Sequence, residues 1–189
     1  QWIDASQTEV GLFINGPAIL DWSANGRIWT RTGNRSPYKP AAPHGAYPCV
    51  GDDRWIAIAC FNEAEWHALA EVAGHPEWTR DPRFKDLASR MANLDALDKL
   101  IGGWTQTQDP YAAMLALQKS AVPAGVCQHA GDRCDNDPQL KTLEWLTEVT
   151  GTKIGRWPIA EVPIKMSESP AYIGGRLDRG APCYGEDNE

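Results

Sequence analysis

The chain has 189 residues, of which 42% are hydrophobic and 23% are charged, and its formal net charge is −7. This composition is typical of a globular protein and excludes an intrinsically disordered one. The acidic balance and the scattered Lys and Arg residues argue against nucleic-acid or anionic-membrane binding, because both need clustered positive charge. No apolar stretch approaches the ~20 residues that span a bilayer. Five widely spaced cysteines favour reduced thiols in a cytoplasmic protein over a disulfide framework.

The two ends of the chain are interpreted as cuts through a longer protein. Gln1–Asp4 has the pattern of a strand but no Met before it, and Gly185–Glu189 follows no closing helix. A native domain rarely begins inside a strand, so we expect further sequence on both sides.

Ala5–Asp21 is predicted to be a mostly apolar helix. Ser6 is its expected N-cap, with Glu9 in the reciprocal capping position. Pro17 should kink or split the helix. Apolar residues occur on more than one face, so we expect the helix to be largely buried. Ser23–Pro43 is punctuated by Gly and Pro and is interpreted as a linker or extended arm.

A small α+β unit is predicted over roughly residues 45–130. Ala46–Cys49 and Trp55–Cys60 are expected to form a hairpin through the turn Gly51–Asp53. Helical patterns follow, most of them beginning at an N-cap residue. The predicted helices are Asn62–Gly74, Asp86–Met91, Asn93–Trp104 and Asp109–Lys119, and strands are predicted at Val122–Cys127 and within Leu146–Lys165.

Six short phrases, in order along the chain, resemble those of class III coenzyme A transferases (the CaiB/BaiF family). Each phrase alone is weak, but their common order covers nearly the whole chain and about the last half of a typical family member. The phrases are Gln1–Ser6; Asn34–Arg35 with Ala42–Cys49 and Asp53–Ala59; Asn62–Trp66 with Gly74–Glu77 and Asp81–Phe84; Arg90 with Asn93 and Leu97; Val122–Val126 with Asp137–Leu140; and Arg179–Glu186.

The resemblance implies an incomplete family III fold, in which a small α+β domain is flanked by pieces of an α/β Rossmann-like large domain. On this picture residues 1–24 belong to the large domain and residues 25–44 form a linker. Residues 45–130 form the small domain, and residues 131–189 return to the large one. Family members are interlocked homodimers, so we expect that arrangement for the full-length protein.

The resemblance also implies the reaction. Family members move CoA between carboxylic acids through intermediates on a nucleophilic aspartate. That aspartate lies before the point matching Gln1, so we assign no catalytic residue in this chain and expect the chain alone to be inactive. Acyl-CoA and a carboxylic acid are the expected partners, with no metal or redox cofactor.

The candidate substrate-binding residues lie where some family members carry a glycine-rich loop over the intermediate. They are His44, Gly45, Ala46 and Tyr47, together with Asn34 and Arg35 of the preceding arm. Gly45 would allow close backbone approach, and backbone N–H groups there could stabilise an oxyanion. Arg35 could bind a carboxylate or phosphate, although a salt bridge with a partner chain is at least as good an alternative. His44 is expected in an exposed loop, and Tyr47 could equally be a core residue.

The sequence also allows other interpretations of its chemistry and function. Cys127, His129 and Cys134 could seed a metal site, but the spacing lacks a fourth ligand and isolated thiols explain it better. The main functional alternative is a non-catalytic binding or assembly module of a larger protein. A third alternative is an acyl-CoA racemase or lyase relative, whose catalytic residues would also lie upstream.

Overall fold

The computed structural model describes residues 4, 6–36, 39–151, 155–161, 164–169 and 182–185. Its contacts divide the chain into two compact units, Gln1–Cys127 and Gln128–Glu189, each described here by itself. The strand predicted at Gln1–Asp4 lies outside the described residues except for Asp4. The predicted domain boundaries stay predictions.

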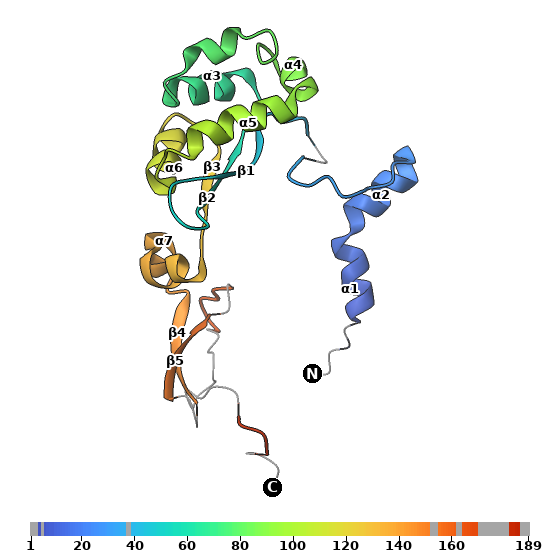
Figure 1. Cartoon of the computed structure of the whole chain (residues 1–189). Helices are drawn as coiled ribbons and strands as arrows, with labels where there is room; N and C mark the ends of the chain where they lie inside the picture. The colour runs from blue at the N-terminus through green and yellow to red at the C-terminus, as the bar shows by residue number, and fades with distance from the viewer. Residues whose placement is uncertain are drawn as a thin grey trace. The chain divides into compact units, whose positions relative to one another are not determined.

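The first unit begins with two short helices, α1 (Gln7–Ile14) and α2 (Gly16–Asn25) (Figure 1). The Ser6 hydroxyl accepts a hydrogen bond from the Glu9 N–H at 3.4 Å, which confirms the predicted N-cap. Pro17 lies in the first turn of α2, so the predicted split is confirmed.

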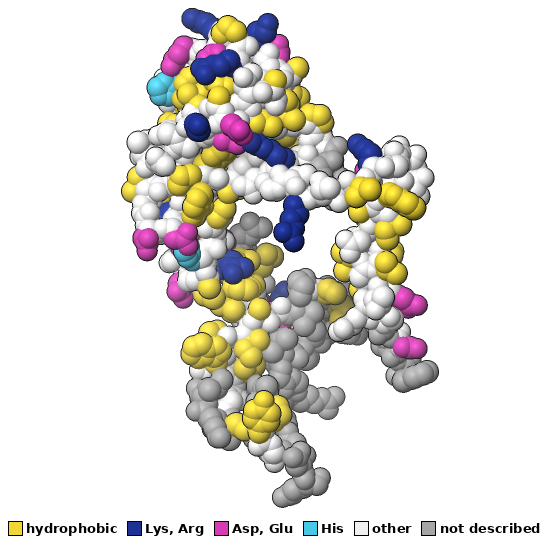
Figure 2. All heavy atoms as spheres, turned by 45° about the vertical axis from the view of Figure 1, so that its right-hand side comes forward, with side chains coloured by type: hydrophobic (Ala, Val, Ile, Leu, Met, Phe, Trp, Pro, Cys, Tyr) yellow, Lys and Arg dark blue, Asp and Glu magenta, His cyan; other side chains and the backbone are white. Residues whose placement is uncertain are grey.

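The expected burial of these helices is wrong for this chain. Neither helix has a buried residue, and Phe13 is 86% exposed. Figure 2 shows hydrophobic side chains along the length of the two helices. The prediction failed because apolar residues on several faces need covering partners, and the described residues supply none.

A three-stranded antiparallel sheet organises the rest of this unit, in the order β1 (His44–Pro48), β2 (Trp55–Ala59), β3 (Ala124–Cys127). Tyr47 of β1 lies opposite Ile56 of β2, and Ile56 lies opposite Val126 of β3. The predicted hairpin is therefore confirmed. Its turn needs left-handed backbone at Gly51 (φ 110°) and Asp53 (φ 48°).

Five helical segments accompany this sheet: α3 (Glu63–Val72), the 3₁₀ helix η1 (Pro76–Arg80), α4 (Leu87–Ala92), α5 (Leu94–Thr105) and α6 (Pro110–Lys119). Helix α5 packs against β1, and α6 packs against β2 and β3. Helix α3 packs against η1 and α6, and α4 packs against α5. The side chains of Asn62 and Asp109 cap the helices that follow them, which confirms the two predicted caps, and Asp86 caps α4 in the same way.

The core lies between the sheet and the helices. Burial of each large aliphatic side chain stabilises the fold by about 1.5–3 kcal/mol. The largest completely or almost completely buried side chains are Trp66, Arg90, Phe84, Ile56, Ile58, Leu69, Leu97, Ile101, Leu117 and Val122. The opposite face of the sheet carries exposed Trp55 and Ala57, because successive strand residues point to opposite sides.

The second unit contains a π-helical turn η2 (Asp132–Asn136), helix α7 (Pro138–Thr142), and a hairpin of β4 (Leu146–Gly151) and β5 (Gly155–Ala160). Within its described residues, Val149 is the one buried hydrophobic side chain. No helix in the described part of the chain is long and apolar enough to cross a membrane.

Candidate active-site wall

A groove of about 640 Å³ runs beside β1. It is walled by residues 32–35 of the arm, by β1, and by one side of α5. All six residues predicted to bind substrate line it: Asn34, Arg35, His44, Gly45, Ala46 and Tyr47. The structure thus brings the arm and β1 together in the wall of one groove. Their contact with a substrate stays a prediction.

Gly45 lies directly under the Tyr47 side chain. A Cβ at Gly45 would lie 3.0 Å from the Tyr47 hydroxyl oxygen and 3.1 Å from its ring carbon Cζ. Only glycine therefore fits without moving the ring, and close approach between two parts of the protein explains this glycine.

Tyr47 is 3% exposed, so it is a core residue at the edge of the groove. Its hydroxyl donates to Asp98 Oδ1 at 2.8 Å. Burial, and then the neighbouring Asp98 carboxylate, raise the pKa of Tyr47 above its ordinary value. Tyr47 therefore remains a neutral donor that is already engaged by Asp98.

Arg35 ties the arm to α5. Its Nη1 lies 2.9 Å from Asp98 Oδ2, in an ion pair, and its Nη2 donates to Asp95 Oδ1 at 3.2 Å. These ion pairs lie within the chain, whereas the predicted alternative was a salt bridge with a partner chain, which stays a prediction. Arg35 fixes the arm beside β1, and its charge is largely balanced by the two carboxylates.

His44 begins β1 and is half-buried, so the expectation of an exposed loop residue is wrong. Its Nδ1 contacts the carbonyl oxygen of Asn34. Because a carbonyl oxygen only accepts hydrogen bonds, Nδ1 carries the proton in this contact. The Nε2 atom of neutral His44 is then a lone-pair acceptor.

A second groove of about 520 Å³ also borders β1. It shares the wall formed by Asn34, His44 and Ala46. Its remaining lining includes small residues from β2 and β3, such as Ala57 and Gly125. Five of the six candidate residues therefore line both grooves, and Tyr47 lines only the first.

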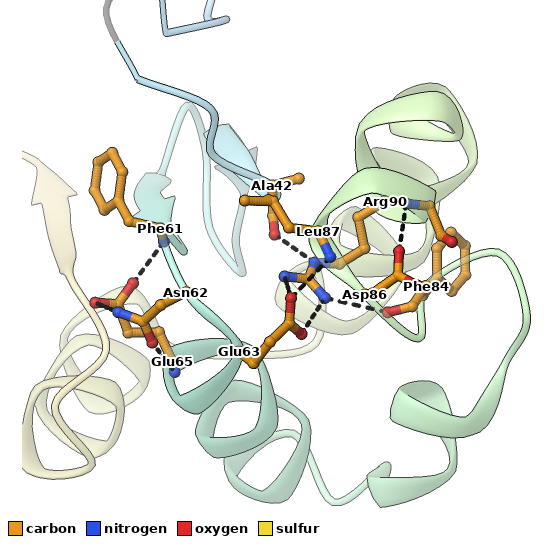
Figure 3. Close-up of polar contacts among 10 residues, drawn as sticks. Ala42, Phe61, Asn62, Glu63, Glu65, Phe84, Asp86, Leu87 and Arg90 are labelled. Carbon is orange, nitrogen blue, oxygen red and sulfur yellow. Dashed lines mark hydrogen bonds and ion pairs between the residues drawn. The ribbon is translucent and has the colours of Figure 1, made fainter.

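The chain just before β1 is anchored by a buried arginine (Figure 3). Arg90 Nε donates to the Ala42 carbonyl at 2.8 Å, and its Nη1 lies 2.8 Å from Glu63 Oε2. The guanidinium also lies over the Trp66 ring, 5.2 Å from its centroid. Hydrogen bonding to Arg90 lowers the pKa of Glu63, which favours the ionised carboxylate. Arg90 thereby fixes where β1 starts.

Helix α5 contributes further residues to the lining of the groove, among them Asp98, Gly102 and Gly103. None of these three was among the site residues predicted from the sequence. Two adjacent glycines inside a helix cost about 1 kcal/mol each relative to alanine. An added Cβ at either glycine meets nothing within 4 Å, so the pair leaves open space in the groove. The pair of glycines one turn after Asp98 was therefore the feature of the sequence that could have indicated this side of the groove.

Within the described residues, no group of three or more His, Cys, Asp and Glu side chains lies close enough to hold a metal ion. The side chains around the groove instead supply hydrogen-bond donors, acceptors and one engaged ion-pair network.

Comparison with known proteins identifies the family of the chain. The sequence model of the family described as CoA-transferase family III matches residues 1–188 of the chain. The chain belongs to this family. A crystal structure of a CaiB/BaiF family protein from Brucella suis is similar over 97% of the chain and 45% of the solved chain, with a TM-score of 0.79 and 26% identity. The mixed α/β fold is thus a family III fold.

Sequence relatives agree with this assignment. The chain is 30% identical to a succinyl-CoA:mesaconate CoA-transferase from Haloarcula hispanica, over 93% of the chain and 43% of the relative. It is 35% identical to an acetyl-CoA:oxalate CoA-transferase from Acetobacter aceti, over 83% of the chain and 39% of the relative. The family III chain spans less than half the length of these relatives.

Proposed function

We propose that the protein containing this chain transfers CoA between carboxylic acids, and that residues 32–48 form the supporting wall of its active site. The observation that carries the proposal is the groove in which the arm, β1 and α5 meet. The named activities of the two family III relatives, which use succinyl-CoA or acetyl-CoA with a second acid, support the substrate class.

The nucleophile in this proposal is an aspartate outside residues 1–189, whose carboxylate attacks the thioester carbonyl, breaks the C–S bond and releases CoA as its thiolate, leaving an acyl anhydride on the aspartate. The carboxylate nearest to the candidate residues is Asp98. It accepts from Tyr47 and pairs with Arg35, at 2.8 Å and 2.9 Å. Such an engaged carboxylate is a poor nucleophile, which supports a role in positioning. The CoA thioester is then the substrate and no resident cofactor is required.

The proposal includes the small-domain assignment of residues 45–130 and an interlocked homodimer. The exposed apolar side chains of α1 and α2 support a covering surface from another part of the protein or a second copy. In that arrangement, residues 1–24 and 131–189 belong to the large domain.

The test is a CoA-transfer assay on the protein that contains this chain. Succinyl-CoA or acetyl-CoA is the donor, and mesaconate, oxalate or citramalate is the acceptor. We expect transfer by that protein and none by the isolated 189-residue chain. Turnover by the highly purified chain would overturn the location of the nucleophile. Failure of the larger protein with a broad set of donors and acids would overturn the proposed reaction.

A further inference from the structure

The hydrogen-bonding register of β1 can be read from its two ends. The Cys49 N–H donates to the Arg54 carbonyl at 2.8 Å, and the Cys60 N–H donates to the Pro43 carbonyl at 2.8 Å. In an antiparallel pair, the residues that exchange hydrogen bonds alternate with those that do not. Every second residue of β1 between these ends therefore points its N–H and C=O toward β2.

Gly45 and Tyr47 are the residues that point toward β2, opposite Ile58 and Ile56. His44 and Ala46 consequently direct their backbone N–H and C=O groups away from β2. Because β1 is an outer strand of the sheet, these groups form an open edge. No described residue makes a backbone hydrogen bond to them. The backbone donors facing the outside are thus those of His44 and Ala46, and the Gly45 N–H belongs to the sheet.

This open edge is short. Pro48, the next outward-facing residue after Ala46, lacks an N–H, and the Ala42 N–H already donates to the Cys60 carbonyl at 2.9 Å. His44 and Ala46 therefore supply the donors of the edge, about 7 Å apart at the usual rise of a strand. Because the row of free donors ends on both sides, a long partner strand cannot pair along β1. An extended chain with only a few amide groups fits such an edge better than a protein strand does.

The space beside the edge is open. The groove of about 640 Å³ is lined by β1, by Asn34 and Arg35 of the arm, and by Gly102 and Gly103 of α5. Side chains at the two glycines would occupy free space, since a Cβ at either one has no neighbour within 4 Å. A helix that accepts the cost of two glycines here leaves room beside β1 for a bound molecule.

We propose that the open edge of β1 binds the pantetheine arm of the acyl-CoA substrate through backbone hydrogen bonds. Amide carbonyls of the arm accept from the N–H groups of His44 and Ala46, and amide N–H groups donate to the carbonyls of these residues. The edge presents donors and acceptors together, which matches an amide, whereas the carboxylate of the acid substrate brings only acceptors. This inference rests on the proposed function, because that function supplies a CoA thioester.

The first experiment uses the ¹⁵N-labelled chain and pantetheine as the probe. We expect pantetheine to shift the backbone amide signals of His44 and Ala46 and to slow their exchange with solvent. The amide signals of Gly45 and Tyr47 serve as internal controls, because their N–H groups are already used in the sheet. Unchanged His44 and Ala46 signals up to the solubility limit of pantetheine overturn the inference.

The second experiment removes one donor. Replacing the Ala46 amide with an ester, through an α-hydroxy acid, deletes its N–H and keeps the side chain. We expect pantetheine to bind about five-fold more weakly, as for the loss of one neutral hydrogen bond. Ala46→Pro also removes the N–H and is tolerated best at a strand edge, and Ala46→Gly is the matched variant that keeps it. Wild-type affinity in the ester variant overturns the inference.

The outcomes separate this inference from the proposed function. CoA transfer by the protein that contains the chain, without any response of His44 and Ala46 to pantetheine, overturns the inference alone. A pantetheine response without CoA transfer leaves the edge assignment standing and overturns the reaction. A response to a strand-forming peptide in place of pantetheine identifies a protein partner and overturns the inference.

Discussion

Tyr47 and Asp98 lie 51 positions apart in the sequence, yet the Tyr47 hydroxyl donates to Asp98 at 2.8 Å. Asp98 also pairs with Arg35, so one carboxylate joins the arm, β1 and α5. The chemistry of each residue changes accordingly. Tyr47 is a structural donor, Arg35 is an anchor, and His44 retains an Nε2 atom without a hydrogen-bond partner among the described residues.

Asp21 in α2 is a second carboxylate that joins several groups through hydrogen bonds. Its Oδ1 accepts from Asn25 at 2.7 Å and from Arg27, and its Oδ2 accepts from Trp29 at 2.6 Å. Hydrogen bonds from Asn25, then Trp29 and Arg27, lower the pKa of Asp21 to about 2. The residues after α2 are thereby held back against the helix.

The pH dependence of this cluster follows from the direction of that shift. Since the folded pKa lies below the ordinary value of 3.8, the cluster stabilises the fold above pH 3.8 and loses this contribution as pH falls toward about 2. A ¹³C titration of the Asp21 carboxyl should show a midpoint near the lowered value. Asn25→Ala should raise that midpoint, and a wild-type midpoint near 3.8 would contradict the contacts described.

Polar contacts position individual helices and strands, and the pattern of hydrophobic residues in the sequence does not predict these contacts. Glu63 at the start of α3 pairs with Arg90 in α4, and Arg90 in turn holds the Ala42 carbonyl ahead of β1. Arg90 is completely buried, whereas the Glu63 side chain is 47% exposed. The pair therefore fixes three elements together at the cost of burying one charge.

Glu63→Ala tests this arrangement. It leaves the buried Arg90 guanidinium without its counter-ion, and we expect a loss of about 3 kcal/mol in the free energy of unfolding, the lower end for breaking a buried pair. Urea unfolding followed by tryptophan fluorescence measures the change. Glu71→Ala, an exposed carboxylate on the same helix, is the control and should change stability by less than about 0.5 kcal/mol. Equal effects of the two substitutions would contradict the anchoring role.

Among the residues that the structure describes, the large hydrophobic cluster lies in the first unit. The buried cluster draws its members from residues between Ala42 and Val122. Helices α1 and α2 contribute no buried side chain, and the described part of the second unit contributes Val149. Helices of this length are marginal in water without packing partners. Stability should thus be concentrated in the sheet and the helices that cover it.

A piece containing residues 32–127 should fold alone. It includes the whole buried cluster, the arm and the groove, so we expect cooperative unfolding with a Tm within a few degrees of the value for the complete chain. Circular dichroism melting of both proteins measures this. The reverse piece, residues 128–189, is the control and should show no comparable transition. A non-cooperative melt of residues 32–127 would mean that the core depends on the remaining residues.

Much of the local structure could be predicted because its signals lie within a few residues. Ser6, Asn62, Asp86 and Asp109 cap the helices that follow them, since the cap and its N–H partner are three positions apart. The hairpin and the split at Pro17 are local for the same reason. The ordered phrases were sufficient to identify the family, because each phrase reflects a local constraint on the chain.

The sequence by itself was sufficient to identify the family, to predict the hairpin and the caps at Ser6, Asn62 and Asp109, and to select six residues in the wall of one groove, whose contact with a substrate stays a prediction. Only the tertiary structure decided which atoms of that wall are available. Strand register turned the backbone groups of Gly45 into the sheet and those of His44 and Ala46 outward, and Asp98 engaged both Tyr47 and Arg35. The physical reason is that hydrogen-bond pairing and burial depend on segments that are distant in sequence, so residue type alone does not reveal them.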